Sequence, residues 1–137
     1  MIDHIGLNVR DIARATEFYL KALAPLGYGI VVQVSAEERG GHGPAIGFGP
    51  PGKPADFQSG KPSFWIAEGE PRSGPMHVAF VAPSRAAVDA FYQAAVKAGG
   101  KDNGPPGLRP EYHANYYGAF VFDPDGNNAE AVCHLPG

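Results

Sequence analysis

The sequence predicts an α+β protein in which two paired βαβββ modules form a single domain, residues 1–137. Its 137 residues are about the length of one domain. The second observation is an internal repeat: His4 and the Phe18-Tyr19 pair recur without a gap as His77 and Phe91-Tyr92. The third is that each copy reads as strand, helix and further strands. Module one is expected at about 1–70 and module two at about 75–137.

The first strand and helix of each copy follow from side-chain periodicity. In the opening strand, Ile5, Leu7 and Val9 alternate with the residues of the other face, which are His4, Gly6 and Asn8. Asp11 and Ser84 are good N-caps for the two helices. The apolar stripes of the helices are Ile12, Ala15, Tyr19 and Leu23 in the first and Ala87, Phe91, Ala94 and Ala95 in the second.

Glycines predict where the helices end, and apolar segments predict the remaining strands. Gly27 and the Gly99-Gly100 pair are expected to terminate the helices. Further strands are expected in YGIVVQV, AIGFG and PSFWIA, then in KDNGPPG, YYGAFVFD and AEAVCH. The DPDGNN segment predicts a tight turn between the last two. The paired modules are expected to form a curved mixed sheet, with helices outside and a concave cup inside.

Composition limits the possible functions. The chain is 44% hydrophobic and 18% charged, with a net charge of -3, which is typical of a soluble globular protein. It has no basic cluster for nucleic acid, no apolar run long enough for a membrane span and no signal peptide, so we expect a cytoplasmic protein. Cys133 is the only cysteine, which excludes an internal disulfide and a thiolate-rich metal site.

Two histidines and one carboxylate suggest a metal site. The repeat places His4 and His77 at corresponding positions, and Glu130 lies in the last predicted strand. A buried carboxylate needs a partner, although Glu130 could instead face solvent at a sheet edge. If the three side chains converge, they would hold one divalent ion, such as Fe, Zn, Mn, Ni or Co, and leave positions for other ligands.

The chain resembles the vicinal oxygen chelate superfamily, which includes glyoxalase I, bleomycin-resistance proteins and extradiol dioxygenases. The matching stretches are IDHIGLNVRDIARATEFYLKAL, MHVAFVAPSRAAVDAFYQAAVKAGG and YYGAFVFDPDGNNAEAV, which is the pattern of a minimal two-module member. The resemblance implies a metal on His4, His77 and Glu130, a small-molecule substrate or ligand and a homodimer. It favours a metal-dependent dioxygenase, lyase or isomerase. The alternative is a non-catalytic protein that binds a drug or metabolite.

The chain departs from glyoxalase I in one strand. That branch has a second glutamate on the last strand of module one, where this chain has KPSFWIAEG. The inward positions are Ser63 and Trp65 in one register, or Phe64 and Ile66 in the other. Glu68 comes too late to be the fourth ligand, so a glutathione-dependent lyase is less favoured. Trp65, Ser63 and Asn8 are candidate substrate-binding residues, and an ordinary core tryptophan is the alternative for Trp65.

The segment RPEYHANYYGAF supplies the remaining candidates. His113, Tyr116 and Tyr117 are candidate proton donors or substrate anchors, and alternation along the strand leaves either tyrosine facing the cup. A loop that packs its aromatic rings over the core is the structural alternative. Arg109 is a candidate anchor for an anionic substrate, although such a residue can also be a simple surface charge.

Overall fold

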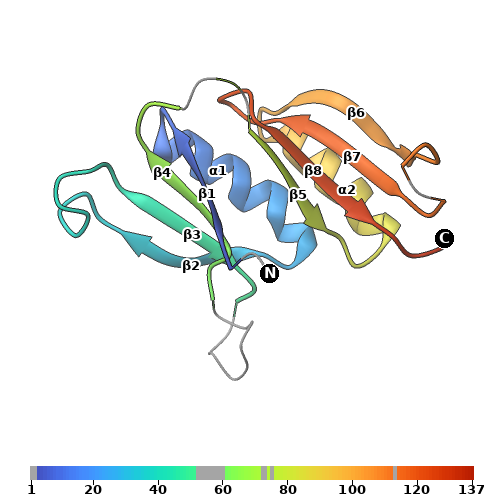
Figure 1. The fold of residues 1–137 in the computed structure, drawn as a ribbon, viewed down its shortest axis with the longest axis horizontal. Helices are drawn as coiled ribbons and strands as arrows, with labels where there is room; N and C mark the ends of the chain where they lie inside the picture. Colours follow the sequence, from blue (N-terminus) through green and yellow to red (C-terminus); the bar gives the residue numbers. More distant parts are fainter. Residues whose placement is uncertain (1–2, 52–60, 72–73, 75, 113) are drawn as a thin grey trace.

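The computed structural model describes residues 3–51, 61–71, 74, 76–112 and 114–137, and it confirms the predicted order of elements (Figure 1). Module one contains β1 (Ile5–Val9), α1 (Ile12–Leu23), the 3₁₀ turn η1 (Ala24–Leu26), β2 (Gly29–Val34), β3 (Ala45–Gly49) and β4 (Phe64–Glu68). Module two contains β5 (His77–Val81), α2 (Arg85–Lys97), β6 (Lys101–Leu108), β7 (Tyr117–Phe122) and β8 (Asn128–Cys133). The strand expected in KDNGPPG is β6.

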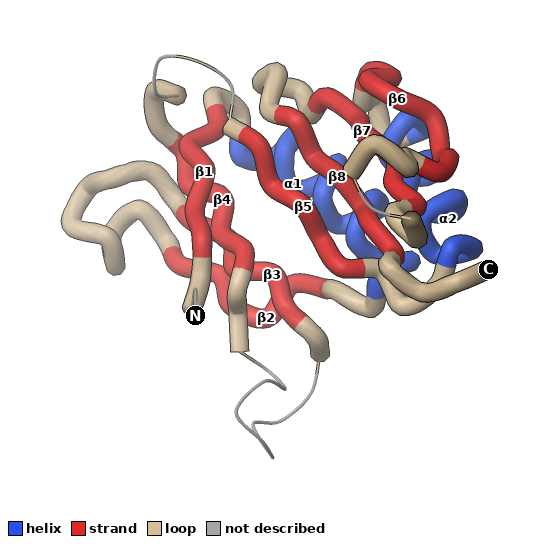
Figure 2. Tube along the Cα trace, turned by 45° about the vertical axis from the view of Figure 1, so that its right-hand side comes forward, coloured by secondary structure: helices blue, strands red, loops and turns tan. Residues whose placement is uncertain are grey.

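The two modules have the same sheet topology, as the repeat predicts. The strand orders are β1-β4-β3-β2 and β5-β8-β7-β6. The β1–β4 and β5–β8 pairs are parallel, and the other neighbouring strands are antiparallel. The α+β class is therefore confirmed. The two hydrogen-bonded ladders are separate, so β1 and β5 are edge strands. Figures 1 and 2 show both helices on the same side of the two sheets.

The predicted N-caps and the first helix stop are confirmed. The Asp11 carboxylate accepts a hydrogen bond from the Arg14 backbone N–H at 3.0 Å, and the Ser84 hydroxyl accepts one from Ala87 at 3.1 Å. Gly27 follows η1 with φ +81°, a left-handed conformation that favours glycine. These local signals start each helix shortly after β1 and β5; His4 immediately precedes β1, and His77 begins β5.

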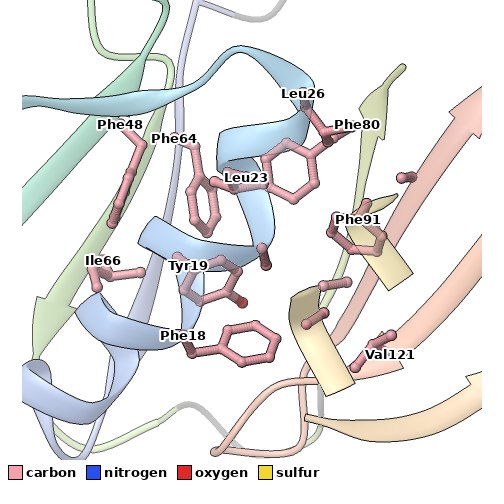
Figure 3. Close-up of a cluster of buried hydrophobic side chains, with 14 of the residues drawn as sticks. Phe18, Tyr19, Leu23, Leu26, Phe48, Phe64, Ile66, Phe80, Phe91 and Val121 are labelled. Carbon is pink, nitrogen blue, oxygen red and sulfur yellow. The ribbon is translucent and has the colours of Figure 1, made fainter. Parts of the chain in front are cut away.

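One hydrophobic core joins the modules (Figure 3). Tyr19 of α1 packs edge-on against Phe64 of β4, with ring centroids 4.8 Å apart. Phe64 in turn meets Phe80 of β5 at 5.1 Å, also edge-on. The contact between Phe64 and Phe80 crosses from one sheet to the other. The two sheets therefore pack against one shared hydrophobic core.

A buried hydrogen-bond cluster also connects the modules. Asp123, in the turn between β7 and β8, is 5% exposed. Its carboxylate accepts a 2.7 Å hydrogen bond from the Tyr19 hydroxyl of module one. It also accepts hydrogen bonds from the Asp125 and Asn127 backbone N–H groups and from the Asn127 side-chain amide. The DPDGNN segment thus forms the predicted turn, and the hydrogen bond from Tyr19 connects this turn to α1.

The helices of the described residues, α1 and α2, are both too short to cross a membrane.

Candidate metal centre

Strand register brings His77 and Glu130 together on the concave face of module two. In the parallel β5–β8 pair, Ala79 lies opposite Glu130 and His77 lies opposite Asn128. The Glu130 side chain is only 2% exposed, whereas that of His77 is 51% exposed. Their Nε2 and Oε2 atoms are 3.1 Å apart. Glu130 is therefore a buried carboxylate with a histidine partner at the surface of the concavity.

A backbone carbonyl orients the His77 ring. Its Nδ1 atom lies 3.1 Å from the carbonyl oxygen of Asn128, which can only accept a hydrogen bond, so Nδ1 carries the hydrogen. In the neutral imidazole this tautomer leaves the lone pair on Nε2, the ring nitrogen that lies 3.1 Å from Glu130 Oε2. Metal-binding histidines commonly have such an outer-shell acceptor on the second ring nitrogen.

Tyr116 holds the second oxygen of Glu130. Its hydroxyl donates a hydrogen bond to Glu130 Oε1, while His77 contacts Oε2. Burial, followed by the hydrogen bond and negative charge of Glu130, raises the pKa of Tyr116 to about 12. Tyr116 is therefore a hydrogen-bond donor at neutral pH. Gly118 makes room for this contact, because a Cβ there would lie 3.1 Å from the tyrosine ring and 3.3 Å from Oε1.

His4 lies in a different concavity, on module one. Its side chain is 59% exposed, and Nδ1 contacts the Asp3 carboxylate at 2.8 Å. Hydrogen bonds from His4 and Lys61 lower the pKa of Asp3. His4 borders a cavity of about 350 Å³ whose lining comes entirely from module one: His4, Gly6, Val34, Arg39, Ala45, Trp65 and Ala67.

The two repeated histidines are at opposite ends of the groove between the sheets. Ile5, next to His4, shares a 230 Å³ cavity with residues 78–81 of β5. The later part of β1 instead shares a 320 Å³ cavity with Met76, next to His77. The two histidines are therefore separated by roughly the length of β5, about 13 Å. Consistently, no three His, Cys, Asp or Glu side chains of the described residues are grouped closely enough to hold a metal.

The substrate-binding candidates of module one surround these cavities. Trp65 is on the concave face, where a Cβ on Gly47 would be 3.0 Å from its indole ring. Ser63 lines the 230 Å³ cavity, with its hydroxyl 3.2 Å from that of Tyr28. Asn8 lines the 320 Å³ cavity and donates to the Glu70 carbonyl at 3.1 Å. The register with Ser63 and Trp65 facing the cavities is the one observed, because Phe64 and Ile66 are in the core.

The candidates of module two divide between its two faces. Tyr117 points away from the concave face toward α2, where its hydroxyl donates to Asp89 at 2.8 Å. That placement puts Tyr117 on the opposite face of β7 from Tyr116 and Glu130. The Arg109 guanidinium lies over the Phe120 ring, 5.7 Å from its centroid. His113 is outside the described residues.

Several contributors were missed by the sequence reasoning. The Asn128 carbonyl, the Asp3 carboxylate and Arg39 of the His4 cavity carry no recognisable sequence signal. Gly118 does, because a glycine inside an apolar strand indicates close approach of a neighbouring group.

A family model places the chain among known proteins. Residues 1–131 match the model described as the Glyoxalase/Bleomycin resistance protein/Dioxygenase superfamily. The chain belongs to this superfamily. Solved structures of its members share the fold over nearly the whole chain, and the family expectation stated from the sequence is confirmed. No curated protein matches the chain significantly.

Three solved structures illustrate the similarity to the superfamily. A glyoxalase/bleomycin resistance protein from Albidiferax ferrireducens T118 is 26% identical, with a TM-score of 0.72 and 98% of each chain covered. A glyoxylase/bleomycin resistance protein/dioxygenase domain from Frankia sp. EAN1pec is 21% identical, with a TM-score of 0.69, covering 97% of this chain and 96% of that one. The V278E glyoxalase I mutant from Zea mays is 24% identical, with a TM-score of 0.70; the match covers 96% of this chain and 45% of the Zea mays chain.

Proposed function

We propose that the protein is a metal-dependent enzyme that binds vicinal oxygens of a small substrate at a centre built on His77, Glu130 and His4. The observation that carries the proposal is the 3.1 Å contact between His77 Nε2 and Glu130 Oε2. Membership of a superfamily that includes glyoxalases and dioxygenases supports the same reading. The metal would be one divalent ion, such as Fe, Zn, Mn, Ni or Co.

The residues present fit a divalent ion. Two adjacent ligands that each lie about 2.1 Å from a metal are about 3 Å apart, which matches the contact between His77 and Glu130. Both ligating atoms have an outer-shell arrangement, since Asn128 orients the imidazole and Tyr116 holds the other carboxylate oxygen. The nitrogen and oxygen donors suit borderline and hard divalent metals rather than a soft-metal site.

A bound divalent ion would act as a Lewis acid and a template for two neighbouring substrate oxygens. The protein side chains would supply orientation around it. Tyr116 fixes the Glu130 carboxylate by donating its hydroxyl hydrogen to Oε1. Trp65 provides a flat apolar wall above Gly47 in module one. Among the described residues, no second carboxylate lines that cavity beside Trp65, so a dioxygenase or isomerase is favoured over a glutathione-dependent lyase.

Metal titration tests the centre. Zn²⁺ competition with a coloured chelator should show tight binding by the wild-type protein. His77→Ala should lose more than the roughly 10- to 100-fold in affinity that removal of an outer-shell partner costs. His42→Ala is the matched control, since His42 is an exposed histidine of module one outside both cavities. Equal affinity in wild type and His77→Ala would refute the proposal.

A second copy of the chain would supply His4. Within one chain His4 and His77 are at opposite ends of the inter-sheet groove, so a three-ligand centre needs module one of a partner. The variants His4→Ala and His77→Ala should each bind Zn²⁺ weakly. After joint unfolding and refolding, each mixed dimer should regain one of its two tight sites, because the intact His4 of one chain would meet the intact His77 of the other. Failure of every mixture to regain binding would contradict a shared site.

A binding protein without turnover is the second candidate. It is favoured by the 350 Å³ cavity that Trp65 and other largely apolar residues line. Turnover assays of the metal-loaded protein with catechols and 2-oxoaldehyde adducts discriminate the two. Stoichiometric binding without product in all of these would favour sequestration.

A further inference from the structure

We infer that Arg109 forms an anion-binding subsite on the concave face of module two, so that the ligand of the proposed centre carries a carboxylate. This inference rests on the proposed function, because the subsite is defined relative to Glu130. It goes beyond that function by naming the chemical class of the ligand: a compact molecule with two vicinal oxygens and an acidic group.

Backbone pairing places Arg109 on the same face as the candidate metal ligands. The Arg109 backbone N–H donates to the Tyr116 carbonyl at 2.7 Å, which continues the β6–β7 ladder past Leu108. The guanidinium lies over the ring of Phe120, and Phe120 is directly opposite Glu130 in the β7–β8 register. Two strand spacings therefore separate Arg109 from Glu130, which is on the order of 10 Å.

Glycines and carbonyl groups hold the guanidinium in one orientation. A Cβ on Gly107 would lie 2.8 Å from Nη1, and a Cβ on Gly104 would lie 3.5 Å from Nη2. Nη2 donates to the Pro105 carbonyl at 2.7 Å, and Nη1 donates to the carbonyl of Leu108 at 3.3 Å. The two glycines thus form a cradle for the side chain. Such preorganisation lowers the ordering cost of binding an anion.

The charge of Arg109 has no carboxylate partner among the described residues. Among the described cations, Arg10, Lys21 and Lys61 do have one, on Asp125, Glu17 and Asp3 respectively. A guanidinium stacked on an aromatic ring is weakly hydrated and presents planar donors that match a carboxylate. We therefore expect a ligand carboxylate to pair with the Arg109 guanidinium.

Three ligands test the subsite with Co²⁺-loaded protein: 3,4-dihydroxybenzoate, its neutral isostere 3,4-dihydroxybenzamide, and catechol. Calorimetry gives the affinities, and the Co²⁺ absorption bands report chelation without turnover. Wild type should favour the benzoate over the benzamide, and Arg109→Gln should reduce that preference about tenfold or more, the usual worth of a charge-assisted hydrogen bond. Lys97→Gln is the control, because Lys97 is exposed at the end of α2.

The possible outcomes separate the two proposals. Binding of all three ligands with the same benzoate preference in wild type and Arg109→Gln would overturn the subsite and leave the metal centre intact. Absence of any change in the Co²⁺ bands with every ligand would overturn the metal centre, and the subsite with it. If Arg109→Gln does not fold, Arg109→Lys keeps the charge but loses the planar donors. It should then show a smaller, but measurable, loss of preference, and an unchanged preference would overturn the subsite.

Discussion

Replacing Tyr19 with Phe should destabilise the protein by about 2 kcal/mol, within the range for a hydrogen bond to a charged group. The Tyr19 hydroxyl donates to Asp123 at 2.7 Å across the two modules, and both side chains are buried. Asp123 keeps three other donors from Asp125 and Asn127. The loss therefore lies toward the lower end of the range rather than at the cost of an unpaired buried charge.

The same substitution should change the alkaline pH dependence. Burial, followed by the negative charge of Asp123, raises the pKa of Tyr19 well above its usual value. A raised folded-state pKa contributes stability that is complete below the unfolded-state pKa, about 10 for tyrosine. That contribution decreases as the pH rises above 10 toward the folded-state pKa. Wild type should therefore lose free energy of unfolding above pH 10 more steeply than Tyr19→Phe.

Urea unfolding at pH 7 and at several values above pH 9 measures both effects. The control is Tyr112→Phe, since Tyr112 is 65% exposed. Its cost should be below about 0.5 kcal/mol, as for other exposed substitutions. Equal destabilisation by the two substitutions, or parallel alkaline curves for wild type and Tyr19→Phe, would refute the reasoning about the buried inter-module hydrogen bond.

Three further predictions concern the metal centre and α2. Tyr116→Phe should lower Zn²⁺ affinity about 10- to 100-fold by releasing Glu130 Oε1, and an unchanged affinity in chelator competition would contradict this. Gly118→Ala should also weaken Zn²⁺ binding, because its Cβ would displace Tyr116 or Glu130, whereas circular dichroism should show the fold retained. Ser84→Ala should cost about 1 kcal/mol in urea unfolding by removing the cap from Ala87, with metal affinity as the control that stays constant.

Local signals made much of the fold predictable. Asp11 and Ser84 predict the helix starts because their side chains can accept hydrogen bonds from the first turn. The repeated glycine position illustrates a limit. Gly27 has a positive φ, whereas at Gly100 a Cβ would lie 2.4 Å from the Val121 side chain. A glycine in the sequence does not reveal which of these two constraints applies.

The candidate site was predictable in part, for a physical reason. Strand alternation identifies the face on which a residue lies, and the β5–β8 register brings His77 to Glu130. It does not identify which face is concave, because Phe120 is on the concave face while the smaller Val121 packs into the core. That ambiguity left both Tyr116 and Tyr117 as candidates. The separation of His4 from His77 depends on how the modules pack, and no local pattern encodes that packing.

X-ray absorption at the cobalt edge of the Co²⁺-loaded protein tests the central claim most directly. The account predicts a shell of nitrogen and oxygen ligands with imidazole scattering, and loss of part of that scattering in His77→Ala. A spectrum without imidazole scattering, or one that His77→Ala leaves unchanged, would contradict a metal centre on His77 and Glu130.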